Sequence, residues 1–227
     1  MSSNNTTKDI STYYDEAYFV DFQQKIGEFS GWAETMKFAA YILPSDTVID
    51  FGCGGGYILK NITCAKRLGV EINDTARACA EKVNGIGAVK FTDDLEDSVA
   101  DIIISNHCLE HCPSPYSELV KLFKKLKPGG RIVFFVPHES ISNKWVRGNV
   151  DNHLYTWNPT TLGNLFTSAG YEIDMVKPFY QVWPPFYRKI AKLGPQIFNL
   201  ACYIYGYWRK NNSQVKIVAR KPHAPNV

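Results

Sequence analysis

The segment of this 227-residue chain that most directly indicates chemistry is a glycine-rich run at residues 50–56, DFGCGGG. The β-branched and aromatic stretch Thr47–Phe51 leads into it, and a helix-forming stretch begins at Tyr57. A glycine turn between a strand and a helix lets a ligand approach the backbone, because no Cβ is in the way and the helix N-terminus has free N–H donors. The run therefore predicts a ligand-binding loop.

The residues on either side of the glycines narrow the kind of ligand. A phosphate-binding P-loop would continue Gly-Lys-Ser/Thr, whereas Tyr57-Ile58-Leu59 follows here. A Gly-x-Gly-x-x-Gly dinucleotide turn would need glycine in place of Tyr57, and its anionic pyrophosphate gains nothing from Asp50. An acid at this place favours a ligand with a positive ammonium or sulfonium group, and S-adenosylmethionine carries both.

Acids also follow the next two predicted strands. Glu71 ends the second strand, where a carboxylate can accept hydrogen bonds from both ribose hydroxyls. Asp93 and Asp94 follow the third, and one of them can accept from an adenine amino group while the backbone of Leu95 meets the ring edge. For this pair of aspartates, an ordinary solvated loop is an equally good interpretation.

Four of the five histidines fall in loops that should meet at the carboxyl ends of the strands: His107, His111, His138 and His153. Methyl transfer to a hydroxyl needs an aligned acceptor and a group that takes its proton, and histidine suits that task near neutral pH. His107 is the first candidate, because it follows the fourth strand beside Asn106. For His111, packing at a helix end is the favoured interpretation.

The elements that would position these residues alternate between strand-like and helix-like patterns. The predicted strands are Thr47–Phe51, Arg67–Ile72, Ala88–Phe91, Asp101–Ser105, Arg131–Val136, Tyr171–Val176 and Gln214–Arg220. The predicted helices are Tyr57–Ile62, Asp74–Val83, Tyr116–Leu126 and Leu162–Ala169, after a helical segment at 13–43. This alternation predicts an α/β fold with a mostly parallel sheet covered on both faces.

Composition excludes several classes of protein. The 45% hydrophobic content is enough for a core, and a net charge of +3 of mixed sign gives no nucleic-acid footprint. The six cysteines lack a Cys-x-x-Cys pair, so we expect reduced thiols in a cytoplasmic protein. No signal peptide and no membrane-spanning run is predicted, and residues 1–12 read as a polar tail.

Taken together, these motifs resemble the class I S-adenosylmethionine-dependent methyltransferases, in particular the type 11 and ubiquinone-biosynthesis-like branch. Residues 50–56 match the glycine motif of that family and Glu71 matches its ribose acid. Residues 105–111 resemble its segment after strand four, and residues 126–130 its turn before strand five. The resemblance covers about residues 46–176 and specifies the cofactor and the fold, not the acceptor.

The resemblance implies a Rossmann-like, doubly wound sheet of seven strands with the last strand antiparallel, and a helical insert between the last two strands. We therefore expect an N-terminal helical cap at 1–43 and a methyltransferase domain at 44–227. The insert, 177–213, is rich in aromatic residues. Three interpretations of it stay open: a pocket lid, helices that cover the core or contact a second copy, and a membrane-surface segment with basic flanks.

The expected function is S-adenosylmethionine-dependent O-methylation of a small-molecule or sugar-containing metabolite. The expected catalytic residues are His107, His138 and His153. The expected cofactor contacts are Asp50, Gly52, Cys53, Gly54, Gly56, Glu71, Ile72, Asp94, Leu95 and Asn106. Alternatives are metal-assisted 2′-O-methylation of an RNA terminus and a non-catalytic cofactor-binding protein. Nucleic-acid binding is not favoured, and the oligomeric state is open.

The metal alternative rests on a spacing. His107, Glu110 and His111 stand at i, i+3 and i+4, as in a metal-binding helical turn, and His153 offers a fourth ligand. The arrangement is similar to the metal site of small-RNA 3′-terminal 2′-O-methyltransferases. Because Leu-Glu-His is widespread in the resembled branch without metal, the sequence alone favours no metal, although a divalent ion that acidifies an acceptor hydroxyl is an open alternative.

Overall fold

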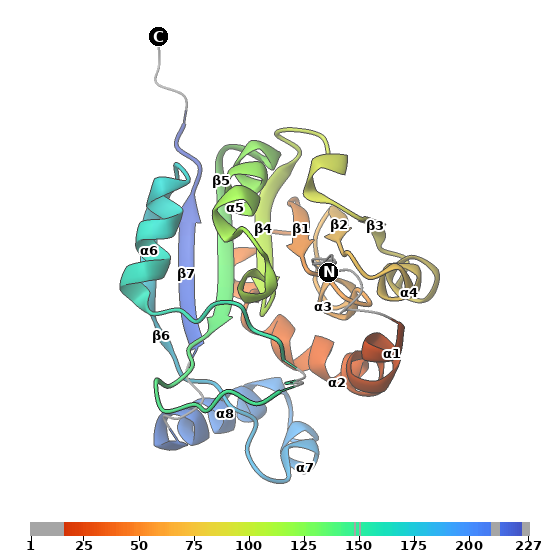
Figure 1. Ribbon diagram of the computed structural model, residues 1–227. Coiled ribbons are helices and arrows are strands. Elements are labelled where there is room, and N and C mark those ends of the chain that lie inside the picture. The colour runs from red at the N-terminus through yellow and green to blue at the C-terminus, as the bar shows by residue number, and fades with distance from the viewer. Residues whose placement is uncertain (1–15, 148, 150, 210–213, 224–227) are drawn as a thin grey trace, which may run out of the picture.

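The computed structural model describes residues 16–147, 149, 151–209 and 214–223. The predictions for the tail 1–12, for the first three residues of the helical segment 13–43, and for residues 210–213 of the insert therefore lie outside the described residues. In the rest of the chain, helices surround one central sheet (Figure 1).

The sheet has seven strands in the order β3-β2-β1-β4-β5-β7-β6. Their bounds are β1 Thr47–Phe51, β2 Lys66–Val70, β3 Gly87–Val89, β4 Ala100–Asn106, β5 Leu126–Pro137, β6 Glu172–Phe179 and β7 Gln214–Arg220. The first five are parallel, and β7 runs antiparallel to both β5 and β6. The predicted Rossmann-like sheet with an antiparallel last strand is confirmed.

Of the strand boundaries, that of the fifth strand differs most from its prediction. The fifth strand was expected to begin at Arg131 after a turn, but β5 begins at Leu126. Leu126 already pairs with Ala100 of β4, and the register shifts before Ile102 pairs with Arg131. Gly129 takes a left-handed φ of 78° in this irregular stretch. The Lys-Pro-Gly-Gly run is therefore a distortion within the strand, because pairing with β4 resumes on both sides of it.

Helices cover both faces of the sheet, so β5 is buried on both sides. Phe134 packs in a T-shaped contact with Phe166, at 5.7 Å between ring centroids, and Phe135 packs in the same way on Phe38 at 5.2 Å. Adjacent strand residues point to opposite faces, so these rings mark the two core layers. The covering helices are α5 Pro115–Lys125 and α6 Pro159–Ser168 on the Phe134 face, and α3 Tyr57–Lys60 and α4 Asp74–Asn84 on the other.

The N-terminal segment is helical, as expected, but it is not one continuous α-helix. It consists of α1 Glu16–Tyr18, a π-helical turn Phe19–Gln23, α2 Gln24–Thr35 and a 3₁₀ turn Ala39–Tyr41. Glycines allow α2 to lie against the start of α3, since a Cβ on Gly31 would stand 2.4 Å from the backbone oxygen of Tyr57. The segment is thereby held next to the glycine-rich loop.

The predicted helical insert is confirmed as α7 Tyr187–Ala191 and α8 Pro195–Arg209. Phe198 and Cys202 of α8 are buried against Ala33 of α2, with Phe29 and Trp183 packed around them. In Figure 1 the N-terminal helices and the insert lie together beyond the carboxyl ends of the parallel strands. The division into a cap and a domain stays a prediction. In the described part of the chain, every helix is too short or too polar to cross a bilayer.

Candidate active site

A cavity of about 460 Å³ opens at the carboxyl edge of the sheet, beside the glycine-rich loop. Four predicted site residues line it: Gly52, Glu71, Ile72 and His107. Its wall also includes residues that the sequence analysis did not single out, among them Gln23, Phe91, Thr92, Cys108, Ser117 and Lys121. The carboxyl edges of parallel strands are where α/β proteins bind ligands, so the cavity lies where the cofactor was expected.

The glycine-rich loop has the backbone conformation that its composition predicts. Gly52, Gly54 and Gly56 have φ values of 79°, 53° and 77°, in the left-handed region that side chains other than glycine rarely adopt. A Cβ on Gly52 would stand 2.4 Å from the sulfur of Cys108, so the segment after β4 lies directly against the loop. The buried Ser105 hydroxyl donates to the Phe51 carbonyl at 2.7 Å and joins the two strand ends.

Glu71 links the loop to the second strand. Its carboxylate accepts hydrogen bonds from the backbone N–H groups of Gly54 and Asn73, both at 2.8 Å. Burial raises the pKa of Glu71, and these two donors oppose that effect. The carboxylate is therefore held in one position at the cavity wall, where a ribose hydroxyl could reach it.

Asp50 is a buried acid at the end of β1. Its side chain is 1% exposed, and its Oδ2 atom has no hydrogen-bond partner among the described residues. Burial, and then the nearby Glu71, raise the pKa of Asp50 to about 8. A buried carboxylate oxygen without a donor suits a cationic ligand group. Asp50 does not line the cavity wall directly, so it would act on the ammonium or sulfonium charge through the glycine-rich loop.

Several other predicted cofactor contacts have different neighbours in the structure. The Asp94 carboxylate accepts from the Phe91 backbone at 3.0 Å and closes a 3₁₀ turn, Thr92–Asp94. Leu95 packs in the core, and its carbonyl accepts from Lys125 at 2.6 Å. Phe91 and Thr92 line the cavity in their place. The roles of Asp94 and Leu95 in adenine binding stay predictions.

Cys53, Gly56 and Asn106 likewise lie behind the cavity wall. The Cys53 thiol is buried, and burial raises its pKa well above the usual range. The Asn106 side chain accepts from the ammonium of Lys37 at 2.9 Å, and Lys37 also donates to Gln214. Lys37 is a buried cation from the N-terminal segment. Packing between segments far apart in the sequence brings Lys37 to the end of β4. No local sequence pattern could therefore predict its contact with Asn106.

Two of the four predicted histidines, His107 and His111, line the cavity, and His138 and His153 do not. His107 lines the cavity with a strained φ of 55°, and burial, followed by repulsion from Lys37, lowers its pKa to about 3. The His138 Nδ1 atom instead lies 2.6 Å from the Trp157 carbonyl, away from the cavity. The His111 and His153 rings are in contact, with centroids 4.9 Å apart and an angle of 60° between their planes. His111 also lines the cavity, whereas His153 does not.

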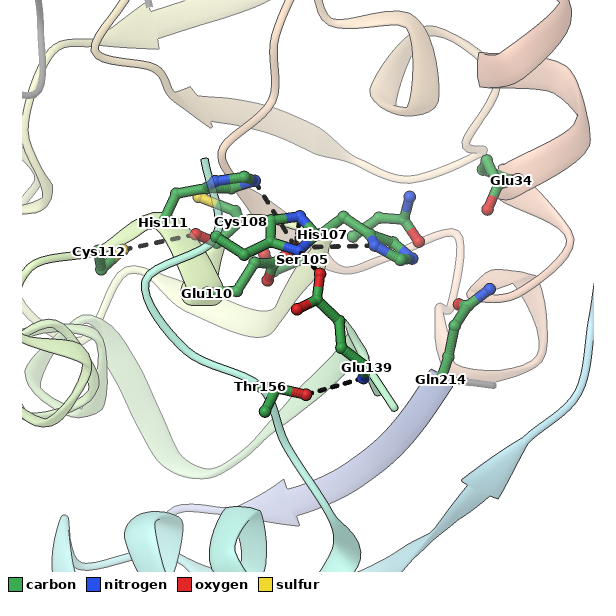
Figure 2. Close-up of polar contacts among 12 residues, drawn as sticks. Glu34, Ser105, His107, Cys108, Glu110, His111, Cys112, Glu139, Thr156 and Gln214 are labelled. Atoms are coloured by element: carbon green, nitrogen blue, oxygen red, sulfur yellow. Dashed lines mark hydrogen bonds and ion pairs between the residues drawn. The ribbon is translucent and has the colours of Figure 1, made fainter. Parts of the chain in front are cut away.

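The spacing of His107, Glu110 and His111 is that of a metal-binding helical turn, but the structure has no α-helix there. Leu109–His111 form a single 3₁₀ turn, and His107 precedes it with a left-handed backbone. The three side chains nevertheless converge, because the His107 Nδ1 and His111 Nε2 atoms lie 3.6 and 3.7 Å from one Glu110 oxygen. Figure 2 shows His107, Glu110 and His111 with Glu139, which comes from the loop after β5.

The sheet order, the glycine-rich loop after β1 and the acid after β2 define a class I S-adenosylmethionine-dependent methyltransferase. The chain belongs to the methyltransferase domain family, whose family model matches residues 23–176. The glycine run, the acidic strand end and the cavity fit that cofactor, with Gly52, Gly54, Glu71 and Asp50 as the residues that would hold it.

Curated relatives point to one branch of this family. The chain is 28% identical over 124 residues to a ubiquinone biosynthesis O-methyltransferase of Idiomarina loihiensis, a match that covers 49% of this chain and 51% of the relative. A second such enzyme, from Pseudomonas savastanoi, is 24% identical over 178 residues, 67% of this chain and 76% of that one. The chain thus spans about half the length of the first relative.

Solved structures agree on the fold. A methyltransferase solved in complex with the Haloferax volcanii Trm112 methyltransferase activator has a TM-score of 0.69 at 19% identity, over 91% of this chain and 97% of that one. A Haemonchus contortus phosphoethanolamine N-methyltransferase with S-adenosylhomocysteine has a TM-score of 0.65 at 13% identity, over 96% of this chain and 61% of that one. At these identities the likeness shows the fold, and a shared fold does not specify an acceptor.

Proposed function

We propose that this protein transfers the methyl group of S-adenosylmethionine to a hydroxyl oxygen of a small-molecule acceptor. The observation that carries the proposal is the position of His107. It lines the same cavity as Gly52 and Glu71, the two residues that belong to the glycine-rich loop and the acidic strand end. Its low pKa keeps the imidazole uncharged at neutral pH, so a ring nitrogen is free of the proton that would repel a sulfonium.

For methyl transfer, the main task of the protein is to align the acceptor oxygen with the methyl carbon of the cofactor. The acceptor oxygen forms a bond to the methyl carbon while the carbon–sulfur bond breaks, and the bonding pair stays on sulfur. The proton of the hydroxyl passes to His107 as the oxygen loses electron density. With a pKa of about 3, His107 accepts a hydrogen bond well but is a weak base, so the hydroxyl must be acidified by its surroundings or lose its proton late.

The curated relatives support oxygen as the acceptor atom, because both are named as O-methyltransferases. No described feature favours an RNA terminus beyond the histidine cluster discussed below. A non-catalytic protein would not need a histidine with a strained backbone at the cofactor cavity, since strain of this kind is usually retained for function.

Two measurements test the proposal. S-adenosylhomocysteine should raise the melting temperature of the protein, whereas NAD should not. Transfer of a labelled methyl group to a panel of phenolic and sugar hydroxyl acceptors should then be measured for the wild-type protein and for His107→Ala. We expect His107→Ala to bind S-adenosylhomocysteine normally and to lose most of the transfer rate. An equal rate in His107→Ala would refute its role, and label found only on amines would refute oxygen as the acceptor.

We also propose that the insert brings the protein to an anionic membrane surface. One face of α8 exposes apolar side chains at helical spacing: Ile197, Leu200, Ile204, Tyr207 and Trp208. Phe186 and Leu193, at the ends of α7, are 77% and 64% exposed and extend this apolar surface. From residue 175 to the end of the sequence there is no Asp or Glu, whereas Arg188, Lys189 and Lys192 flank the exposed face. An apolar face with basic flanks is typical of helices that lie on anionic lipid.

Co-sedimentation with vesicles tests this contact. The protein should pellet with vesicles that contain phosphatidylglycerol and not with pure phosphatidylcholine, and salt should weaken the binding. Exchange of two exposed residues, Leu200→Ser with Ile204→Ser, should abolish pelleting, whereas Val83→Ser on the exposed side of α4 is the control. Failure to bind anionic vesicles at low salt would leave the face to a protein partner or a second copy.

A further inference from the structure

Glu110 is an acid that the described residues bury but do not satisfy. Its side chain is 0% exposed, and neither carboxylate oxygen meets a hydrogen-bond donor in favourable geometry. A buried carboxylate of this kind is costly unless it is paired with a positive charge or a metal ion.

Three imidazole nitrogens surround one oxygen of this carboxylate. His107 Nδ1 lies 3.6 Å from it, His111 Nε2 lies 3.7 Å away, and His153 Nε2 lies 4.0 Å away. Ligand atoms from Glu110, His111 and His153 all fall within 4.8 Å of one another. Donors around a tetrahedral zinc ion are bonded at about 2.0–2.1 Å, so they stand about 3.3 Å apart. Small side-chain rotations would bring the three donors onto one ion.

His153 is oriented for this role by a second carboxylate. Its Nδ1 atom lies 2.6 Å from the Glu139 carboxylate, which fixes the proton on that nitrogen. The lone pair is therefore on Nε2, the atom that faces Glu110. A carboxylate on the outer nitrogen of a metal-binding histidine is the usual arrangement at zinc sites, because it sets the tautomer and raises the basicity of the ligand. Glu139 would thus be a positioning residue.

We propose that Glu110, His111 and His153 bind a divalent cation such as Zn²⁺ and leave a coordination position open toward His107 and the cavity. Two imidazoles and one carboxylate form a donor set that suits zinc, and sites with three protein ligands keep a position for substrate. His111 also lines the cavity, so an acceptor hydroxyl could reach the ion while it contacts His107.

The cation deepens the proposed function and rests on it. His107 lines the cavity and lies 3.6 Å from the Glu110 carboxylate. A hydroxyl bound to a divalent cation there would lose its proton far more readily than a free one. The acceptor class that this arrangement favours is a molecule with two neighbouring hydroxyls, such as a catechol or a vicinal sugar diol. One oxygen would bind the cation and the other would receive the methyl group, or one oxygen would do both.

Metal binding is tested without reference to activity. Full-length protein stripped with a chelator is titrated with ZnCl₂ by calorimetry, and Co²⁺ is added separately to record the visible absorption of a tetrahedral site. We expect one zinc ion per chain in the wild-type protein. His153→Ala and Glu110→Gln should weaken binding at least tenfold, and Glu139→Gln about 10–100-fold. His223→Ala, remote from the cluster beside Gly129, should bind as the wild type does.

The outcomes separate this inference from the proposed function. The rise in melting temperature with S-adenosylhomocysteine is recorded for every variant, as a check that the fold and the cofactor site are intact. Wild-type protein that binds S-adenosylhomocysteine but not zinc, or His153→Ala that binds zinc as tightly as wild type, overturns the metal site alone. Protein that binds zinc but shows no methyl transfer to any hydroxyl overturns the proposed function. If His153→Ala fails to fold, Glu139→Gln still tests the metal site, because it keeps all three ligands. Zinc binding by Glu139→Gln as tight as that of the wild type would then overturn the site.

Discussion

Glu71 and Glu110 are two buried glutamates at the same edge of the sheet, one after β2 and the other in the turn after β4. Glu71 accepts two backbone hydrogen bonds of 2.8 Å, from Gly54 and Asn73. Glu110 lies 3.6–4.0 Å from three imidazole nitrogens, and among the described residues its oxygens have no hydrogen-bond donor in favourable geometry. The chain therefore satisfies one carboxylate with its own backbone and leaves the other in need of a cation.

This difference divides the site into two halves, which differ in how their buried carboxylates are stabilised. The half at β1 and β2 is preorganised by backbone donors and left-handed glycines, so its geometry does not depend on any ion. The half after β4 contains the buried Glu110 carboxylate and the imidazole nitrogens near it. Among the described residues, neither oxygen of that carboxylate has a hydrogen-bond partner. Mutations in the first half should act on cofactor binding, and mutations in the second on cation binding.

The largest effect is expected at the glycine-rich loop. Gly54→Ala places a Cβ in a left-handed backbone and 3.1 Å from the Gln23 side chain, in the path of the ligand. We expect no detectable binding of S-adenosylhomocysteine by calorimetry. The matched control is Gly85→Ala, which has a similar φ of 65° but nothing within 4 Å of the added Cβ. Both variants should lose roughly 1–2 kcal/mol of stability, but only the first should lose binding.

A smaller effect is expected for Glu71→Gln, which removes the charge but keeps the shape. Hydrogen bonds to a charged group contribute about 1.5–3 kcal/mol, so binding of S-adenosylhomocysteine should weaken about 10–100-fold. Zinc affinity should not change. Glu172→Gln, at an exposed pair with Arg220, is the control. If Glu71→Gln also reduced zinc affinity, the two halves would not be independent.

Asp50 should make the stability of the ligand-free protein depend on pH. Its pKa rises from 3.8 in the unfolded chain to about 8 in the folded one, so between these values the folded chain keeps a proton that the unfolded chain releases. Stability therefore declines as pH rises, by about 1.4 kcal/mol per unit from this group. Between pH 6 and pH 8, the melting temperature of the wild-type protein should fall about 5 °C relative to Asp50→Asn. If the melting temperatures of the two proteins changed with pH in parallel, Asp50 would already be charged at pH 6 in the folded protein.

The smallest effect is expected for Glu110→Gln, and it should have the opposite sign to that of Glu71→Gln. In chelated protein the amide removes a buried carboxylate without a donor, so stability should rise by about 1 kcal/mol, or about 2–4 °C in melting temperature. In the same measurement, Glu71→Gln should lower the melting temperature, because two backbone donors lose a charged partner. A fall for Glu110→Gln in metal-free protein would mean that Glu110 has a partner there, which would contradict the comparison.

Local patterns in the sequence were sufficient for most of the fold. β1 and β7 have the predicted bounds, and the covering helices lie within a few residues of their predicted positions. The fifth strand was predicted too short, because Lys-Pro-Gly-Gly is typical of a turn. Only its pairing with β4 keeps that run in the sheet. The N-terminal segment was predicted as helical, but no local sequence pattern distinguished its π-helical turn at Phe19–Gln23 from an α-helix.

The candidate site was predictable in part. Gly52 and Glu71 could be found because a strand end and a glycine turn place them at the carboxyl edge whatever the rest of the chain does. Thr92 and Phe91 could not be distinguished from Asp94 and Leu95, because a short 3₁₀ turn decides which of them faces the cavity. Lys37 could not be found either, since it reaches the end of β4 only through packing of the N-terminal segment.

The sequence by itself determined the class of protein, the cofactor and the left-handed loop that would hold it. The loop follows from short-range sterics, because glycine tolerates positive φ, and the cofactor from an acid at each strand end beside it. The class follows from the resemblance of these motifs to a known family. Only the tertiary structure decided that His153 meets Glu110 and that Glu139 orients it. That meeting depends on how the connection after β5 folds back across the turn after β4, and contacts so distant along the chain leave no periodic pattern in it.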